Sequence, residues 1–287
     1  MLDIFFFGFL RGAVFALAAF GFSLVLGVLG IVNLAHGVFI VLGASVTYAL
    51  YSAGTPIVLA ALAAAATTGL LGMLIQRLFI DRVFNMHPLM VLVQTFGVAI
   101  IVSELANKAF GTSERLLRLD VPGLPYVEIG SVFVPTYEIV VFVVSLVSAG
   151  LLVAVLNYTS FGRAVRACRD SRQSAELVGI NVPRVFLLTM GICGAWAGLA
   201  GALILGLRPT APHMHFMWTI EAFLVVIIGG LGSMGGALVG GFLYGVLNFA
   251  AYYYWPSTAP AVIFGALIVM LMLRPAGLFG LGTVVRK

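Results

Sequence analysis

Long apolar stretches without a charged residue dominate this chain. Residues 12–76 contain no Asp, Glu, Lys or Arg over 65 positions, and residues 222–273 contain none over 52 positions. A bilayer core about 30 Å thick takes roughly 20 apolar residues per helical crossing. The first stretch therefore holds about three crossings, and the second holds two or three. Membrane β-strands would alternate apolar and polar positions, and these stretches do not. The pattern predicts an all-α, polytopic integral membrane protein.

Turn signals, such as residues 52–56 and His87-Pro88, divide the apolar sequence into eight or nine predicted crossings. The predicted ranges are 5–28, 32–51, 57–77, 88–107, 137–157, 185–206, 219–230, 236–254 and 259–273. The seventh range is short, and it could instead be a broken or re-entrant piece continuous with the eighth. We expect one domain over residues 1–287.

Composition excludes several other classes of protein. Hydrophobic residues make up 62% of the chain and charged residues 9%, whereas about a quarter of a soluble domain is charged. The net charge of +5 comes from basic residues spread between apolar segments, which indicates membrane topology rather than nucleic-acid binding. Cys168 and Cys193 give no disulfide framework, and His213 and His215 are weak evidence for a metal. We recognise no catalytic residue set, so we expect no enzyme activity, no metal and no bound cofactor.

Two polar segments set the predicted orientation. Residues 158–184 hold five arginines against two acidic residues, whereas residues 108–136 are mixed in charge and contain three prolines. If residues 158–184 are cytoplasmic and there are nine crossings, ten basic residues lie inside and four outside, as the positive-inside rule requires. Eight tyrosines and tryptophans then fall at outer ends, where interfacial aromatic residues are expected. The N-terminus is predicted outside and the C-terminus, Lys287, inside.

The arginine-rich segment predicts one helix over residues 163–178 with a narrow face of small side chains. That face consists of Ala164, Cys168, Ser171, Ala175 and Val178. Arg172 and Glu176 are spaced for an i,i+4 pair, and Gly179 is a suitable helix terminator. Such a face can enter a groove on another protein. Composition alone favours the alternative, a helix that lies on anionic headgroups.

Two glycine-rich motifs interrupt the apolar sequence. In residues 27–37, Asn33 and His36 are polar positions that we expect to face the bundle interior or a wet cavity. The alternative is a short loop in which Asn33 caps the next helix and His36 packs. Residues 228–236 contain five glycines around Ser233 and no lysine, so they are not a phosphate-binding loop. They either break a helix near a substrate path or permit close helix packing.

Small residues four apart on the later helices predict tight helix packing. The pairs are Gly191/Ala195, Gly194/Gly198, Ala197/Gly201, Gly236/Gly240, Ala237/Gly241 and Gly241/Gly245. Three charged residues lie in or near predicted crossings: Arg11, Glu104 and Glu221. We interpret the two glutamates as interfacial residues, because each lies near an outer helix end. No carboxylate is clearly at the centre of a crossing, which disfavours a secondary transporter.

The motifs occur in an order that resembles a known family. Gly-Val-Leu-Gly-Ile-Val-Asn-Leu-Ala-His-Gly (27–37), Gly-Arg-Ala-Val-Arg-Ala (162–167), Leu-Val-Gly-Ile-Asn-Val (177–182) and Ile-Gly-Gly-Leu-Gly-Ser-Met-Gly-Gly (228–236) are similar to motifs of the branched-chain amino acid permeases of bacterial ABC importers. The chain resembles the shorter of the two paired permease subunits. One departure is Val38, where the family usually has an acidic or polar residue. Relatives also carry urea, short amides or aromatic acids.

The resemblance implies a permease in the bacterial inner membrane, paired with a second, related permease. It implies two cytoplasmic ATPases, which would use ATP and Mg²⁺, and a periplasmic substrate-binding protein. It also implies a coupling helix, whose residues we identify as Arg163, Ala164, Arg166, Ala167, Cys168, Asp170, Ser171, Ala175, Val178 and Gly179. Near the substrate path we expect Asn33, His36, Gly229, Gly230, Gly232 and Ser233. A passive channel for a small neutral solute is the competing interpretation.

Overall fold

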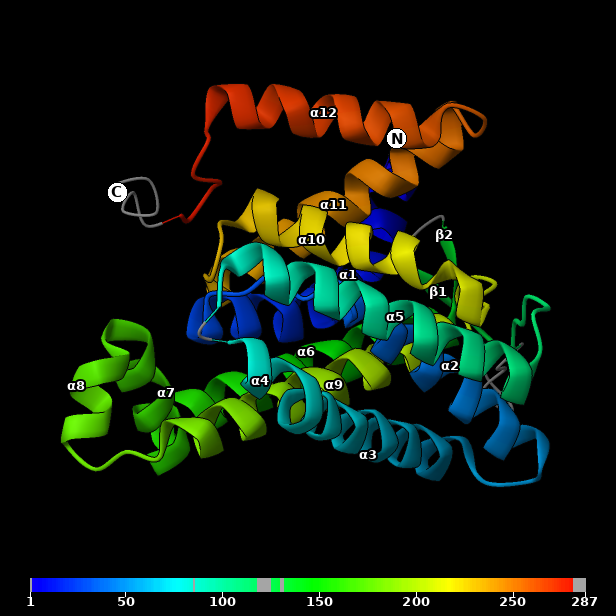
Figure 1. Cartoon of the computed structure of the whole chain (residues 1–287). Coiled ribbons are helices and arrows are strands. Elements are labelled where there is room, and N and C mark those ends of the chain that lie inside the picture. Colours follow the sequence, from blue (N-terminus) through cyan, green and yellow to red (C-terminus); the bar gives the residue numbers. More distant parts are fainter. Residues whose placement is uncertain (1, 85, 118–124, 130–131, 281–287) are drawn as a thin grey trace.

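The protein is a bundle of long helices with one small hairpin. The computed structural model describes residues 2–84, 86–117, 125–129 and 132–280 (Figure 1). Its long helices are α1 (Leu2–Leu29), α2 (His36–Ser52), α3 (Ile57–Ile75), α5 (Pro88–Phe110), α6 (Thr136–Tyr158), α9 (Val182–Ile204), α10 (His215–Gly229), α11 (Met234–Tyr254) and α12 (Ala259–Leu273). The shorter elements are η1 (Gln76–Ile80), α4 (Asp81–Val83), β1 (Tyr126–Ile129), β2 (Val132–Pro135), α7 (Ser160–Asp170), α8 (Arg172–Leu177) and η2 (Pro212–Met214).

The predicted apolar segments correspond to the long helices. Within the described residues, seven helices are long and apolar enough to cross a membrane, whereas α2 with 17 residues and α12 with 15 are shorter. The predicted helical membrane fold is therefore confirmed, while eight or nine full crossings stay a prediction. The seventh and eighth predicted segments are separate helices, α10 and α11. Residues 118–124 of the predicted external loop and residues 281–287, with the predicted cytoplasmic terminus, lie outside the described residues.

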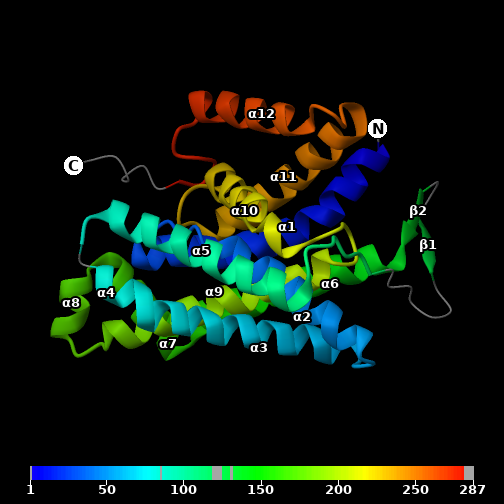
Figure 2. The same ribbon diagram turned by 45° about the vertical axis from the view of Figure 1, so that its right-hand side comes forward.

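Helix α1 forms the centre of the bundle. In its most apolar 18-residue window 89% of residues are buried, against 28% for both α3 and α6. It packs against α6, α9, α10 and α11, and α12 lies beyond α11, on the far side from α3 (Figure 2). The outward faces of α3, α5 and α6 carry exposed Leu, Val and Ile side chains. These faces suit contact with lipid, because lipid tails are as apolar as leucine.

Glycines allow the central helices to touch. A Cβ atom on Gly245 of α11 would lie 2.4 Å from the Cα of Gly12 in α1. One on Gly201 of α9 would lie 1.9 Å from the Ile40 carbonyl oxygen in α2. Because real Cβ contacts are not this close, these helix pairs require a residue without a side chain. The predicted close packing of small residues is confirmed at these positions.

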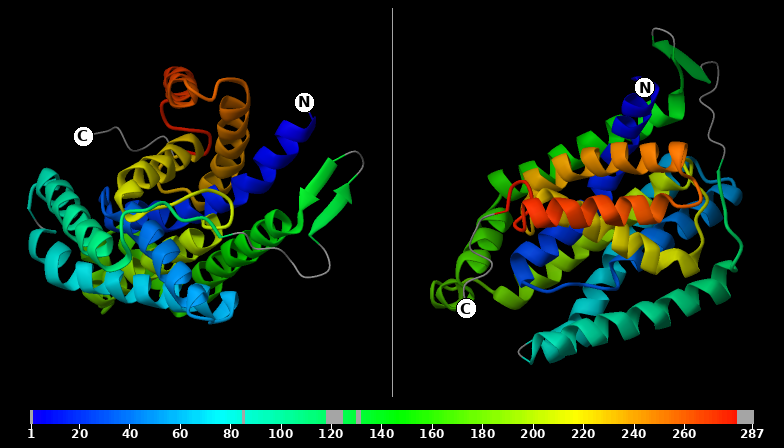
Figure 3. Two further views of the ribbon diagram at one scale, coloured as in Figure 1. Left: turned by 90° about the vertical axis from the view of Figure 1, so that its right-hand side faces the viewer. Right: turned by 90° about the horizontal axis from the view of Figure 1, so that it is seen from above.

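The bundle has two ends of different character (Figure 3). The hairpin of β1 and β2 pairs Tyr126 with Pro135 at one end, which we call the hairpin end. Nearby, the backbones of Arg115 and Thr210 exchange hydrogen bonds of 3.1 and 3.0 Å. At the opposite end α7 and α8 project as an arm, which we define as residues 160–177. The hairpin was not predicted, since we expected a loop over residues 108–136.

The arm is not the single helix that the sequence predicted. Ser171 is extended, with φ −160° and ψ 112°, and it separates α7 from α8. Its hydroxyl accepts a hydrogen bond from the Ser174 amide at 3.2 Å, so it caps the second helix. The predicted continuous helix over residues 163–178 is therefore wrong. The predicted Arg172–Glu176 pair forms, at 3.2 Å, and Gly179 follows α8 with φ +84°.

Candidate functional site

A non-helical segment runs back into the bundle between α1 and α2. Helix α1 ends at Leu29, yet the ring of His36, seven residues later, lies 2.8 Å from the carbonyl oxygen of Ala18. Ala18 is eleven residues before the helix end, or about 16 Å along the axis at 1.5 Å per residue. Residues 30–35 therefore return to the middle of α1 as a non-helical segment. This explains why α2 is short.

Side chains of other helices satisfy the backbone of that segment. The Leu34 amide donates to the Thr95 hydroxyl of α5 at 3.2 Å. The Gly37 amide donates to the Thr219 hydroxyl of α10 at 2.9 Å, and the single proton of that hydroxyl is shared between the carbonyls of His215 at 3.0 Å and Leu34 at 3.3 Å. Irregular backbone at membrane depth is tolerated only where protein or water satisfies it. The segment is thus held by α5 and α10.

Asn33 and His36 are buried among these contacts, with 1% and 0% of their surface exposed. The Asn33 side-chain oxygen accepts from the Ala35 amide at 3.0 Å, just before α2 begins. The second ring nitrogen of His36 lies 3.4 Å from the sulfur of Cys193. Asn33 stabilises the start of α2, and His36 joins α1, α2 and α9. Both side chains face the bundle interior, as expected, and they do so in the short loop with a packed His36 that we gave as the alternative.

The second glycine motif forms a turn between α10 and α11. Residues 230–233 are non-helical, with φ +107° at Gly230 and +75° at Gly232, values that favour glycine. The Ser233 hydroxyl accepts from the Gly236 amide at 3.0 Å and so caps α11. The amides of Leu278 and Phe279 donate to the last carbonyls of α10. The predicted helix break is therefore present.

This turn borders a cavity that the arm also lines. The cavity measures about 530 Å³ and lies between the turn, α1, α6 and α7. Gly232 and Ser233 line it together with Gly27 of α1 and Arg166 of α7. Gly229, the last residue of α10, and Gly230, the first residue of the turn, are both buried. The structure thus brings the turn, the arm and the end of α1 to one cavity, while Asn33 and His36 lie deeper, in the break between α1 and α2.

The small residues of the arm are partly buried. Cys168 and Ala175 are 5% and 2% exposed, and they pack in the protein's own core. Burial raises the pKa of the Cys168 thiol, an effect that Arg172 opposes and Glu176 reinforces. The large apolar residues exposed at the tip, which we define as residues 177–178, are Leu177 at 88% and Val178 at 76%. Two of the five members of the predicted small-residue face are therefore covered by the protein itself, and docking through that face stays a prediction.

At the hairpin end the structure places two arginines on the wall of a second cavity, of about 380 Å³, which we call the arginine cavity. Arg11 lies in α1, and Arg208 lies in the turn after α9. The Arg11 Nη2 atom lies 2.6 Å from the Glu138 Oε1 atom in α6, and the Arg208 Nη1 atom lies 3.2 Å from the Glu221 Oε1 atom in α10. Sequence reasoning missed both pairs, since their members belong to different elements.

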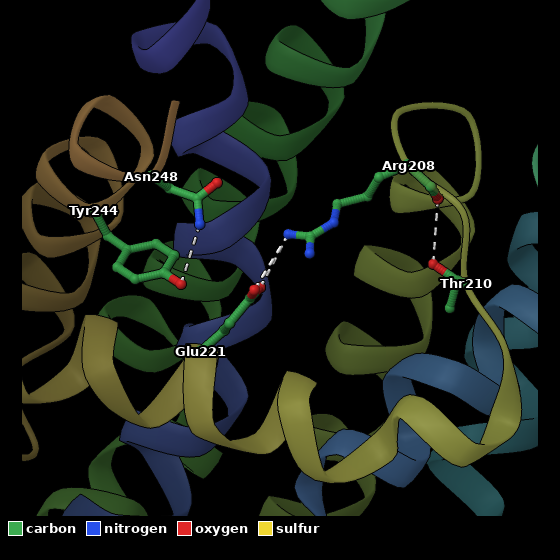
Figure 4. Close-up of polar contacts among 5 residues, drawn as sticks. All are labelled: Arg208, Thr210, Glu221, Tyr244 and Asn248. Carbon is green, nitrogen blue, oxygen red and sulfur yellow. Dashed lines mark hydrogen bonds and ion pairs between the residues drawn. The ribbon is translucent and has the colours of Figure 1, made fainter. Parts of the chain in front are cut away.

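Glu221 is buried rather than interfacial. Figure 4 shows Arg208 and Glu221 pointing toward each other, with Tyr244 and Asn248 of α11 beside them. The Asn248 amide nitrogen donates to the Tyr244 hydroxyl at 3.3 Å. Only 7% of Glu221 is exposed, so it is covered by the bundle, while its level at the membrane interface stays a prediction. A charge inside an apolar bundle is costly without a partner and indicates a functional site.

Helices long and apolar enough to cross a membrane, interior non-helical segments and arginine-bearing cavities at both ends define a multi-pass membrane transport protein. The chain belongs to the family described as branched-chain amino acid transport system / permease component, whose model matches residues 4–273. The resemblance inferred from the motifs is therefore confirmed. No solved structure matches the chain significantly.

Relatives match over nearly the whole chain. The high-affinity branched-chain amino acid transport system permease protein LivH of Escherichia coli is 29% identical, with 94% of this chain and 92% of the relative covered. LivH of Salmonella typhimurium is 30% identical over the same shares. BraD of Pseudomonas aeruginosa, a permease protein of the same kind of system, is 28% identical, again over 94% and 92%. The chain is thus similar to transport permease proteins along its length.

Proposed function

We propose that this chain is the shorter permease subunit of a bacterial ABC importer for branched-chain or other hydrophobic amino acids. The observation that carries the proposal is the similarity to LivH proteins over 94% of the chain. In this proposal a second permease pairs with the chain in the inner membrane. Two cytoplasmic ATPases hydrolyse ATP with Mg²⁺, and a periplasmic binding protein delivers substrate. Urea, short amides and aromatic acids are the other candidate substrates.

The arm is the proposed contact for the ATPases. Its exposed tip presents Leu177 and Val178, two apolar side chains that do not pack in the protein interior. They lie next to a segment rich in arginine. Large exposed apolar side chains in a cluster are typical of interaction sites. The tip therefore replaces the small-residue face in our proposal. Arg172, stacked on the rings of Phe84 at 5.0 Å and Phe186 at 5.8 Å, holds α8 against the bundle.

Movement of the arm can reach the substrate path through the 530 Å³ cavity. Helix α7 lines this cavity opposite the turn at Gly232 and Ser233. Gly232 also lies close to Gly27 of α1. A Cβ atom on Gly232 would lie 3.2 Å from the Gly27 Cα atom, and one on Gly27 would lie 3.3 Å from the Gly232 Cα atom. In the proposed alternating-access mechanism, ATP-driven displacement of the arm shifts this turn and the end of α1. The breaks at residues 30–35 and 230–233 supply the flexible points.

The test uses the assembled complex. We expect Leu177→Asp and Val178→Asp together to abolish co-purification of the ATPase subunits and ATP-driven uptake, because two buried charges would replace apolar contacts. Met86→Asp, at an exposed position of the same end (57% exposed), is the matched control and should leave both unchanged. ATPases that remain bound to the double variant would contradict the docking proposal. Uptake into proteoliposomes without ATP would favour the passive channel instead.

A further inference from the structure

The arginine cavity presents cations to a space that reaches into the bundle. The glutamate side chains are only 7% (Glu138) and 9% (Glu221) exposed, whereas Arg11 is 36% and Arg208 25% exposed. Both arginines line the cavity, and neither glutamate is among the residues that line it. Arg11 follows nine residues of α1, about 14 Å from the helix start. Each carboxylate therefore lies behind its guanidinium, which faces the open space.

The arginines retain donors for another acceptor. Arg208 uses only its Nη1 atom on Glu221, at 3.2 and 3.3 Å from the two carboxylate oxygens. Arg11 uses Nε and Nη2 on Glu138, at 3.3 and 2.6 Å. A guanidinium carries five N–H donors and suits bidentate binding of a carboxylate. The remaining donors of Arg208, on Nε and Nη2, can bind a second carboxylate without breaking the pair.

Aromatic rings fix both guanidiniums in place. The Arg11 guanidinium carbon lies 5.1 Å from the centroid of the Phe249 ring, and that of Arg208 lies 4.7 Å from the Trp218 ring. Stacking of this kind orders a long side chain before a ligand arrives, which lowers the entropic cost of binding. Ion pairs in an apolar interior add little net stability by themselves. Packing alone therefore does not account for two ordered pairs on one cavity.

The rest of the cavity is apolar and suits an aliphatic group. Val14, Ile204 and Leu207 contribute to its wall, and Asn248 supplies one polar side chain. The Asn248 amide nitrogen is occupied by Tyr244, so its oxygen is the part left for an ammonium group. A volume of about 380 Å³ falls in the range of roughly 300–1,000 Å³ that is typical of small-molecule sites. The two ion pairs sum to no net charge, as does a zwitterion.

We propose that the arginine cavity binds a hydrophobic α-amino acid, with its carboxylate on Arg208 and Arg11 and its side chain against the apolar wall. This deepens the proposed function, on which it rests, by naming a recognition site within the permease itself. The carboxylate is the required group, since guanidinium donors dominate the polar surface. Glu221 and Glu138 act as positioning residues, because they hold the two guanidiniums toward the cavity.

The first experiment measures occupancy of the cavity without transport. Leu207→Cys, in the purified complex without ATP, is labelled with a water-soluble thiol reagent; the native thiols of Cys168 and Cys193 are buried. We expect leucine to slow the labelling and leucinamide, which lacks the carboxylate, to leave it unchanged. Isocaproate, which lacks the ammonium group, should protect at higher concentration. Equal protection by leucinamide, or no effect of leucine, would overturn the proposal.

The second experiment measures uptake by the complex in proteoliposomes. Arg208→Gln combined with Glu221→Gln removes the pair without leaving a buried charge, and it should raise the KM for leucine roughly 10- to 100-fold. Arg208→Lys keeps the positive charge but loses the planar guanidinium that binds a carboxylate through two hydrogen bonds. Its KM for leucine should lie between those of the double variant and the unaltered protein. Lys108→Gln changes an exposed cation at the end of α5 and should have no effect. Unchanged KM in the double variant would refute the site.

The two experiments separate this inference from the proposed function. One outcome contradicts only the binding site. The unaltered complex takes up leucine with ATP, but leucine does not protect Leu207→Cys and the double variant has a normal KM. This result overturns the proposal for the arginine cavity and leaves the proposed importer function intact. Protection by isocaproate without ATP-driven uptake of any amino acid supports carboxylate recognition and overturns the importer.

Discussion

The contact between α1 and α11 offers a direct test of the packing argument. In Gly245→Ala the new methyl group would lie 2.4 Å from the Gly12 Cα atom and 2.4 Å from the Gly8 carbonyl oxygen. Ordinary contact needs 3.4–4 Å, so the backbones of α1 and α11 must separate by about 1 Å. Overpacking of this kind costs about 1–3 kcal/mol, and the higher helix propensity of alanine returns up to about 1 kcal/mol.

We therefore expect Gly245→Ala to lower the unfolding temperature of the purified permease by several degrees, at about 2–4 °C per kcal/mol of net destabilisation. Gly265→Ala in α12 is the matched control, because nothing lies within 4 Å of its Cβ position while the propensity gain is the same. Thermal unfolding in detergent, followed by tryptophan fluorescence, compares the two. If both variants unfold at the temperature of the unaltered protein or above it, the claim of close packing at Gly245 is wrong.

Two further predictions concern the arm and the hairpin. A cysteine at Val178, which is 76% exposed, should react with an impermeant maleimide only from the cytoplasmic side, and one at Tyr126, 58% exposed, only from the periplasmic side. The reverse pattern would invert the topology. Cys168 should react slowly at pH 7, because burial raises its pKa and the reactive thiolate is scarce below that pKa. Its rate should increase about tenfold per pH unit as the thiolate fraction rises. Reaction at pH 7 as fast as that of the Val178 cysteine would contradict this.

The helices were predictable because one physical constraint dominates them. A segment in lipid must be apolar over its whole length and must satisfy its own backbone, so charge-free runs and turn signals locate each helix. The predicted ranges 57–77 and 259–273 nearly coincide with α3 and α12. The turn at residues 230–233 was also predictable, since glycines at this density favour backbone with positive φ.

The hairpin and the break in the arm carried local signals that we did not use. Residues 126–129 and 132–135 are rich in β-branched and aromatic side chains and flank a Gly-Ser pair, a pattern typical of a hairpin. Ser171 is a favoured helix-capping residue type. The helical spacing of small residues on both sides of Ser171 suggested continuity, but the cap and the burial of Ala175 favour two helices.

The arginine cavity could not be predicted from spacing. Arg11 and Glu138 are separated by 127 positions, and Arg208 and Glu221 by 13 across a non-helical turn. Neither interval corresponds to neighbours on one helix, so only the packing of α1 against α6, and of the turn after α9 against α10, brings these charges together. The same holds for Asn33 and His36: their polarity indicated an interior position, while their partners on α9 and α1 depended on the fold.

The position of α1 has a consequence for the order in which the protein is made. The most buried helix leaves the ribosome before the helices that cover it, and its mean hydropathy of 2.3 lets it enter the bilayer alone. Arg11 has no ion-pair partner in α6 until Glu138 is synthesised 127 residues later. At about 5–20 residues per second the delay is roughly 6–25 s. During that interval the long arginine side chain can extend along the helix toward headgroup phosphates. Nascent α1 is thus held by lipid first and by α6 only afterwards.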